Sequence, residues 1–396
     1  MAAVAALRAQ RRGRGDGVTV SLVILLSVAA AIAIAALLAL PALLTLLPER
    51  EPGARLGGGL PGTVSLIVPV HGSGAALAAK LDSLRGQRWG PGRLELILSL
   101  DGPVADLPVL PDLPGVDCRV LRNPRRGKYG ALNAAVAASA GELLLFSDLD
   151  ARLAPGALAA MVAVFAEADV GAACARVAVD REDGLMQARY WDHESRLKAR
   201  EMARLGSITA SNGTLLAIRR VLFRPIPAGV VDDLFVGLCA VGAGRRFVFV
   251  PEAVALMPPP ARTLRRVFAR QRRIVCRGLN ALRHCPQALS VRRHGRYALA
   301  LIAHKVLRRA FPLALVLGLA ALLALALHDG GGWLVLALAA LGGLGGALGL
   351  VAALGLDRDP GRWPRVLTLA PWALCVNAGI AMGWYDFLRG RRVTQW

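Results

Sequence analysis

Apolar runs near the two ends of the chain enclose a central region that holds most of the charge. Residues 20–47 are almost entirely apolar and uncharged, and further apolar runs cover residues 310–327, 333–356 and 366–384. The first run exceeds the roughly 20 residues that a helix needs to cross a bilayer core. Because the apolar part of a cleaved signal peptide is shorter, we interpret the first run as a membrane anchor and the later runs as candidate spans.

The central region alternates between strand-like and helix-like patterns. Apolar runs predict strands at residues 63–70, 94–100, 116–122 and 143–146, and helical spacing is found at residues 75–85 and 128–140. Strands that alternate with helices predict an α/β domain with a mainly parallel sheet. Ligands of such sheets bind beyond the carboxyl ends of the strands, so the polar residues there are candidate site residues.

These patterns predict an order of segments along the chain. They are a basic tail at 1–17, a transmembrane segment at 18–47, a linker at 48–62, the α/β domain at 63–261, basic amphipathic interface helices at 262–309, about three transmembrane helices at 310–388 and a basic tail at 389–396. Arginines near both ends favour cytoplasmic termini, whereas Lys305, Arg308 and Arg309 favour the inside for the start of the second span. The charge rule therefore leaves the side of the central domain open.

Composition supports a membrane protein with one working domain. The 396 residues are 55% hydrophobic and 19% charged, and the mean hydropathy of +0.49 excludes long disorder, coiled coil and collagen. The net charge is +21, from 48 basic and 27 acidic residues. The six cysteines are scattered, which favours free thiols in a reducing compartment over disulfides or a zinc site.

The strongest local signal is the pair Asp148 and Asp150, which follows the strand predicted at residues 143–146. If a local turn brings both carboxylates together, they offer hard oxygen ligands to Mg²⁺ or Mn²⁺, which can bridge a diphosphate. The alternative is an Asp-rich turn that caps the next helix. The position at a strand end leaves these two interpretations evenly balanced.

A second carboxylate and a basic loop lie at neighbouring ends. Asp101 ends the strand predicted at 94–100, where it can accept a hydrogen bond from a base or a ribose, or close a turn. Residues 123–133 combine basic side chains, Lys128 among them, with glycines that open a helix. A helix N-terminus with nearby cations suits phosphate, and the alternative is a solvated basic turn.

The second half of the central region carries an acidic pair and an arginine-rich stretch. One carboxylate of Asp232 and Asp233 can serve as a general base if its neighbour and partial burial raise its pKa, and the alternative is a helix-capping pair. Residues 262–283 interleave eight arginines with apolar residues. This predicts a basic amphipathic helix that lies on anionic headgroups or clamps a diphosphate. Nucleic-acid binding is disfavoured because no nucleic-acid motif is present.

Taken in order, these features resemble the family-2 glycosyltransferases, in particular the membrane-anchored bacterial polysaccharide and glycolipid synthases. The matching segments are VPVHG at 68–72, DG at 101–102, GKYGALN at 127–133, SDLD at 147–150, SNG at 211–213, DD at 232–233, QRR at 271–273 and HKVLRR at 304–309. The resemblance covers about residues 63–309. It implies a GT-A-like fold with a nucleotide-sugar half and an acceptor half, an NDP-sugar donor, a divalent ion (Mg²⁺ or Mn²⁺) and inversion of the anomeric centre.

The resemblance also implies roles for individual residues. It assigns the nucleotide-sugar to Pro69, Asp101, Lys128, Asn133, Asp148, Arg272 and Arg273, the metal to Asp148 and Asp150, the acceptor to Asn212, Gly213 and Asp232, and the catalytic base to Asp233. The acid pair departs from the family's Glu-Asp. Val275 stands where processive synthases have a Trp that stacks on the acceptor sugar. We therefore expect transfer of one or a few sugars.

The resulting expectation is an inverting hexosyltransferase of the inner membrane, multi-pass, with its α/β domain in the cytosol, where NDP-sugars are made. Its expected partners are an NDP-sugar, a lipid-linked or polysaccharide acceptor and membrane lipids, but no nucleic acid. One alternative is a membrane-tethered binding or scaffold protein with a degenerate nucleotide site. The other is a metal-dependent nucleotidyltransferase, disfavoured because no P-loop or kinase signature is present.

Overall fold

The computed structural model describes residues 2–50, 57–72, 74–90, 92–104, 107–108, 110, 113–179, 181–258, 263–328, 331–332 and 365–391. The chain divides into two units. The sheet unit comprises Leu44–Pro260, Cys276–Leu301 and Gly390–Trp396, and the helical unit comprises Met1–Leu43, Ala261–Val275 and Ile302–Arg389. The candidate span at 333–356 lies outside the described residues, and the segment boundaries given above stay predictions.

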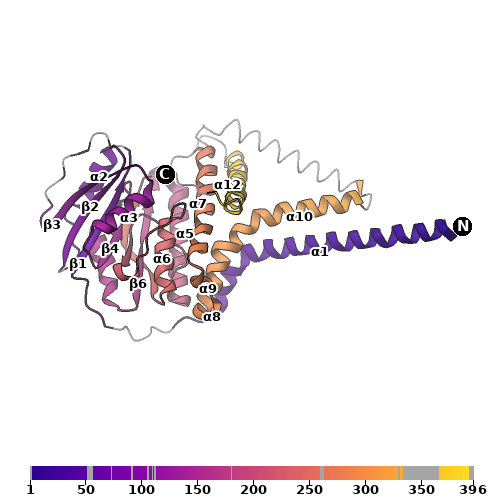
Figure 1. The fold of residues 1–396 in the computed structure, drawn as a ribbon, viewed down its shortest axis with the longest axis horizontal. Coiled ribbons are helices and arrows are strands. Elements are labelled where there is room, and N and C mark those ends of the chain that lie inside the picture. The colour runs from indigo at the N-terminus through magenta and orange to yellow at the C-terminus, as the bar shows by residue number, and fades with distance from the viewer. Residues whose placement is uncertain are drawn as a thin grey trace. The chain divides into compact units, whose positions relative to one another are not determined.

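Within the described residues, one eight-stranded sheet is the frame of the sheet unit (Figure 1). In spatial order its strands are β3 (Val116–Asn123), β2 (Arg93–Asp101), β1 (Thr63–Val70), β4 (Leu143–Phe146), β7 (Leu216–Arg219), β6 (Val170–Val179), β8 (Arg246–Met257) and β5 (Arg152–Leu153). The first four strands are parallel, as are β6 and β8, whereas β7 is antiparallel to β4 and β6, and β5 is antiparallel to β8. Because β7 lies between β4 and β6, these two strands point the same way, and their carboxyl ends share an edge.

The parallel strands β1, β2 and β4 are buried along nearly their whole length, whereas the edge strand β3 is partly exposed. β1, β2 and β4 are mostly apolar, as expected for parallel strands that are covered on both faces. Leu66, Leu96 and Leu145 are fully buried in the core that results. The helix α3 (Lys128–Ala138) packs against β1, β2 and β3, and α2 (Gly74–Leu84) packs against β5. The α/β fold class is thereby confirmed.

Two helices cover the second half of the sheet. The helix α5 (Arg181–Leu205) packs on β6 and β8, and α6 (Asp232–Gly242) packs on β6, β7 and β8. A Cβ atom on Gly237 would lie 2.2 Å from the Phe247 ring, so glycine is required where α6 meets β8. The shorter helices are α4 (Ala157–Ala163), η1 (Val164–Ala166), η2 (Arg220–Leu222), η3 (Pro286–Leu289), α8 (Val291–His294) and α9 (Arg296–Ile302).

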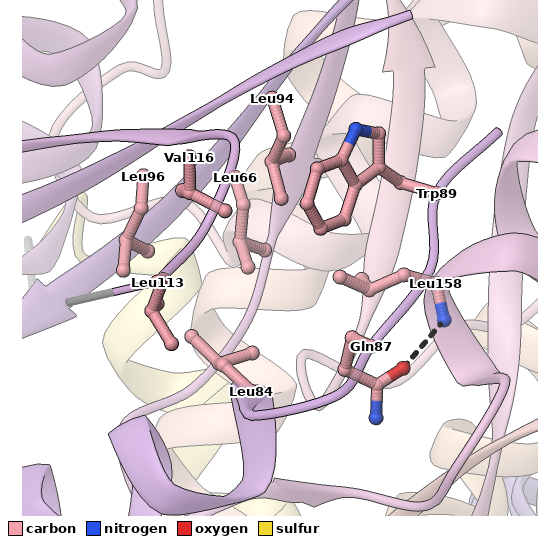
Figure 2. A pocket seen from close by; sticks show the side chains of 9 residues that line it. All are labelled: Leu66, Leu84, Gln87, Trp89, Leu94, Leu96, Leu113, Val116 and Leu158. Carbon is pink, nitrogen blue, oxygen red and sulfur yellow. Dashed lines mark hydrogen bonds between the residues drawn. The ribbon is translucent and has the colours of Figure 1, made fainter. Parts of the chain in front are cut away.

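A small gap remains in the core at the β2–β3 side of the sheet (Figure 2). Its volume is about 10 Å³, barely the space of one water molecule. It is lined by Leu66, Leu84, Gln87, Trp89, Leu94, Leu96, Leu113, Val116 and Leu158. Eight of these side chains are hydrophobic, and the Gln87 amide oxygen accepts a hydrogen bond from the Leu158 N–H at 3.4 Å. This gap is a packing defect of the core with no room for a substrate.

The helical unit contains most of α1 (Ala2–Leu46), the first half of α7 (Leu264–His284), the π-helix η4 (Ala303–Leu307), α10 (Arg308–His328) and α12 (Arg365–Leu388). Among the described residues, two helical stretches are long and apolar enough to cross a membrane, with mean hydropathies of 2.9 and 2.6. They are Gly17–Leu46 and Arg296–His328. A membrane association of the chain is therefore consistent with its helices.

Two glycines allow α12 to lie directly against α7. A Cβ atom on Gly379 would lie 2.8 Å from the Phe268 carbonyl oxygen, and one on Gly383 would lie 2.7 Å from the Val275 Cβ. Small residues at this four-residue spacing permit close helix–helix contact. One turn farther along, the fully buried carboxylate of Asp386 accepts hydrogen bonds from the guanidinium group of Arg272.

Candidate active site

The site begins where β4 ends. The N–H group of Ser147 donates to the Ile67 carbonyl oxygen of β1 at 3.0 Å, so the chain leaves the sheet only at Asp148. The side chain of Asp148 is 28% exposed, and Asp150, at the far end of the same turn, is exposed. The carboxylates that were singled out as metal ligands therefore lie at the carboxyl edge of the sheet.

The centre of the site is the ammonium group of Lys128. Its Nζ lies 2.6 Å from Asp148 Oδ1 and 2.7 Å from Asp232 Oδ2. Lys128 and Asp232 are the first residues of α3 and α6, so one cation joins the starts of two helices to the end of β4. Burial lowers the pKa of Lys128, but the two carboxylates outweigh burial and raise it above its ordinary value.

All three side chains remain partly open to solvent. Lys128 is 20% exposed, Asp148 28% and Asp232 17%. A charged ligand can therefore reach the cluster without unfolding any element. The resemblance assigned Asp232 to the binding of the sugar acceptor and Lys128 to the binding of the nucleotide-sugar. The structure brings these two side chains into contact.

Gly213 covers Asp148 from the acceptor side. Its carbonyl oxygen accepts from the Asp148 N–H at 3.3 Å. A Cβ atom at position 213 would lie 2.9 Å from Asp148 Oδ2, so any larger residue would push on the carboxylate. The SNG segment predicted for the acceptor thus lies next to the predicted metal ligand.

Lys80 was not among the predicted site residues. It is fully buried in α2, and its Nζ donates to Ser147 Oγ at 2.5 Å and to the Ala151 carbonyl oxygen at 2.6 Å. These two acceptors flank the turn that carries Asp148 and Asp150. Burial lowers the pKa of Lys80 to about 7, although both carboxylates oppose that shift.

A sequence signal for Lys80 does exist. Leu77, Lys80, Leu81 and Leu84 follow the spacing of one helix face, and the three leucines are buried. A lysine within an apolar stripe indicates a buried cation with a dedicated partner.

Asp101 fixes the basic loop before α3. Its Oδ1 accepts from the N–H groups of Arg126 at 2.7 Å and Gly127 at 2.9 Å, and the side chain is buried. Gly127 has φ = 86°, a conformation that favours glycine. The carboxylate therefore satisfies backbone donors at the start of α3, which holds Lys128 in place. Its predicted contact with the nucleotide stays a prediction.

Two predicted asparagines are bonded inside the fold. Asn133 donates to the Ile226 carbonyl oxygen and accepts from the Ile226 N–H, both at 2.9 Å. Asn212 donates to the Ala175 carbonyl oxygen at 3.1 Å and accepts from Thr214 Oγ1 at 2.5 Å. Both side chains thereby position loops beside the site, and their predicted ligand contacts are untested.

The two aspartates at the start of α6 have different partners. Asp232 turns to Lys128, as described above. Asp233 is half-buried, and its Oδ1 accepts from the Leu234 N–H at 2.7 Å. The role of Asp233 as a base stays a prediction.

The remaining predicted residues are one proline of β1 and two arginines of α7. Pro69 is buried within β1 opposite Ser99. Arg272 and Arg273 belong to the helical unit, where Arg272 pairs with Asp386. Their predicted contacts with a diphosphate stay predictions.

The residues of the turn fit a divalent cation that is completed by a ligand. Among the described residues, no group of three or more His, Cys, Asp or Glu is placed to hold a metal. Mg²⁺ and Mn²⁺ at nucleotide sites commonly take one or two carboxylates, with substrate phosphates and water in the other positions. Asp148 and Asp150 supply such a set of hard oxygen donors.

The sheet and the acidic residues at its edge define a GT-A-like α/β domain. The sequence model of the family described as Glycosyl transferase family 2 matches residues 65–226. A family-2 glycosyltransferase domain is therefore matched at residues 65–226, in agreement with the resemblance drawn from the motifs.

Two curated relatives are N-acetylglucosaminyltransferases. The protein of Neorhizobium galegae is 30% identical over 222 residues, which cover 50% of this chain and 51% of that protein. The protein of Sinorhizobium fredii (strain NBRC 101917 / NGR234) is 27% identical over 226 residues, which cover 52% and 54%. This chain thus spans about half the length of the curated relatives it matches.

A solved structure shares the fold over nearly the whole chain. It is the mannosyltransferase PcManGT from Pyrobaculum calidifontis in complex with GDP-Man and Mn²⁺. The two structures have a TM-score of 0.65 and 23% sequence identity, and the match covers 92% of this chain and 99% of that one. The likeness confirms the GT-A-like fold.

Proposed function

We propose that the protein moves a sugar residue from an NDP-sugar to a hydroxyl group of a lipid-linked or polysaccharide acceptor at the membrane, with inversion at the anomeric carbon. One observation carries this proposal: the Lys128 ammonium joins the carboxylate of Asp148, inside the family-2 match at residues 65–226, to the carboxylate of Asp232, which follows that match. N-acetylglucosamine is the first donor sugar to test, because two relatives are N-acetylglucosaminyltransferases.

Asp148 and Asp150 would hold a divalent ion, Mg²⁺ or Mn²⁺. When bound, such an ion offsets the negative charge of a departing diphosphate. The Mn²⁺ in the solved mannosyltransferase supports a divalent ion here.

The side chains of the site would stabilise the leaving group and deprotonate the acceptor hydroxyl. Cleavage of the bond between C1 and the diphosphate leaves negative charge on the phosphate, and the Lys128 ammonium would stabilise that charge. The predicted Arg272 and Arg273 would add to this effect. Asp233 would take the proton of the accepting hydroxyl on the opposite face of the sugar, which gives inversion. A base in this position typically contributes ~10²–10⁴-fold in rate.

The substitution Asp233→Asn tests the proposed base, because an amide keeps the shape of the carboxylate but takes up no proton. We expect loss of transfer, assayed with UDP-N-acetylglucosamine and Mn²⁺ on purified protein in detergent, and unchanged donor binding by calorimetry. Asp82→Asn is a matched control, because Asp82 is an exposed aspartate on α2 that pairs only with exposed Arg85 in the described structure. Full activity of Asp233→Asn would reject the role.

Product analysis separates this function from the alternatives. Sugar transfer releases NDP, whereas nucleotidyl transfer leaves NMP on the acceptor or in solution. A binding protein with a degenerate site would show neither product and no dependence on Mg²⁺ or Mn²⁺. A panel of radiolabelled NDP-sugars, followed by lipid extraction, would also identify the donor and the acceptor class.

The proposed location is the inner membrane, with several spans and with the sheet unit in the cytosol. The two long apolar helices support membrane attachment, and the cytosolic side follows from the supply of NDP-sugars. Protease accessibility in sealed inside-out vesicles tests the orientation: cleavage within residues 63–261 is expected there, and protection would contradict it.

A further inference from the structure

A polar cavity lies between the end of β6 and α5, outside the Lys128 cluster. Its volume is about 190 Å³, far more than the 10 Å³ gap in the core. It is lined by Arg176, Val177, Ala178, Val179, Ala188, Trp191 and Asp192. A space of this size holds a ring-sized group or several water molecules.

Arg176 is the basic residue among those that line the cavity. Its Nε atom is buried and makes no hydrogen bond in the described part of the chain, which is costly for a donor. A ligand in the cavity that carries oxygen or nitrogen acceptors can bind the guanidinium group of Arg176.

The other polar side chains narrow the class of ligand. The carboxylate of Asp192 repels anions, which disfavours a phosphate or an acidic group, but it accepts hydrogen bonds from hydroxyls. The Trp191 indole offers a flat apolar face, and Tyr190 packs against it edge to face, with ring centroids 5.2 Å apart. A neutral sugar ring meets all three features: its C–H face covers an aromatic ring, and its hydroxyls both donate and accept.

The cavity is connected to the acceptor side of the site. Arg176 follows Ala175, whose carbonyl oxygen accepts from Asn212 and whose N–H donates to the Leu215 carbonyl oxygen at 3.0 Å. The same segment includes Gly213, which covers Asp148. A continuous path of bonded backbone therefore links the cavity to the Lys128 cluster through the SNG segment, away from the basic loop assigned to the nucleotide.

We infer that this cavity is a subsite for a neutral sugar unit of the acceptor, beyond the unit that carries the reacting hydroxyl. Trp191 stacks on the ring, and Arg176 and Asp192 bind its hydroxyl groups. The inference rests on the proposed glycosyltransferase function. It implies that the acceptor contains at least two sugar units, or one sugar unit distal to the accepting group.

The test compares acceptors of increasing length. With UDP-N-acetylglucosamine as donor, N-acetylglucosamine and its β-1,4-linked di-, tri- and tetrasaccharides serve as acceptors for wild type, Trp191→Ala and Arg176→Gln. We expect KM for the longer acceptors to rise about tenfold or more in both variants. The KM for the monosaccharide acceptor and the rate of slow donor hydrolysis by water should stay unchanged. A general disturbance of the fold would change both of these values. His193→Ala, an exposed neighbour on α5, is the control and leaves all values unchanged.

Each other outcome counts against the subsite. Equal losses for every acceptor, or no loss for any, would overturn it. If the wild type transfers no sugar from any donor, the proposed function fails, and the cavity is then tested alone by tryptophan fluorescence and calorimetry with chitotetraose and cellotetraose. Binding that is lost in Trp191→Ala upholds a sugar site, whereas no binding by the wild type overturns it.

Discussion

Replacing Lys80 by methionine should change how the stability of the protein depends on pH. Methionine keeps the unbranched shape and the helix propensity of lysine but carries no ammonium group. Wild-type Lys80 is fully buried and donates to Ser147 Oγ and the Ala151 carbonyl oxygen at 2.5 and 2.6 Å. Its pKa is lowered by burial from 10.5 to about 7.

The sign of the effect follows from the protons bound in each state. Between about pH 7 and pH 10.5 the unfolded chain still holds the Lys80 proton, whereas the folded protein has released it. Stability rises with pH wherever the unfolded state binds more protons. The free energy of unfolding should therefore gain up to about 1.4 kcal/mol per pH unit from Lys80 in this window. Below about pH 7 both states are charged, and the contribution becomes flat.

Thermal unfolding in detergent between pH 6 and 9.5 measures this contribution. For a domain of this size, the gain corresponds to a rise in Tm of roughly 3–5 °C per pH unit above pH 7. The Tm of wild type minus the Tm of Lys80→Met should rise by that amount per pH unit above pH 7, because the variant lacks the titrating group. Arg85→Met is the control, because Arg85 directly follows the same helix, is exposed and pairs with exposed Asp82. Parallel curves for wild type and Lys80→Met would refute the reasoning.

Further predictions concern the cluster and the loops beside it. Asp148→Ala and Asp150→Ala should each weaken Mn²⁺-dependent nucleotide binding in calorimetry, and an unaltered affinity would reject them as ligands. Lys128→Met leaves its two carboxylate partners without a shared cation, so Tm at pH 7.5 should fall by the equivalent of about 2 kcal/mol. The loss should be smaller at low pH, because burial raises the pKa of Asp148 and a protonated Asp148 no longer needs the cation; an equal loss at pH 7.5 and pH 5 would contradict the charge argument. Asn133→Ala removes both hydrogen bonds to Ile226 and should cost roughly 1–3 kcal/mol, which an unchanged Tm would exclude.

The first half of the sheet was predictable because its strands can be recognised from the local run of apolar residues. β1, β2 and β4 are mostly apolar runs that end at polar residues, and the structure buries those runs in parallel pairs. β6 has no such signature, because alanine and glycine supply half of its residues and have low strand propensity. Its strand form depends on pairing with β7 and β8, which are distant in sequence.

The site was predictable in its residue types but not in its contacts. Position at strand ends indicated Asp101 and Asp148, and the structure places both at the carboxyl edge of the sheet. The local sequence does not indicate which helix N-termini lie next to each other in the fold. The contact between Lys128 and Asp232 could therefore be found only from the structure. Lys80 was missed although it shares an apolar helix face with Leu77, Leu81 and Leu84, because a lysine on a short helix is usually exposed. Its partners, Ser147 and Ala151, are distant in sequence.

The position of Lys128 links donor binding to the geometry of the proposed base. Its ammonium holds Asp232 at 2.7 Å, and Asp233 is the next residue on the first turn of α6. The ammonium has three N–H donors, of which Asp148 and Asp232 can take two, so a diphosphate can accept the third. A shift of Lys128 towards the phosphate would weaken its contacts with Asp148 and with the start of α6 together. In the proposed mechanism, donor binding and the placement of the Asp233 carboxylate would in this way be coupled through a single side chain.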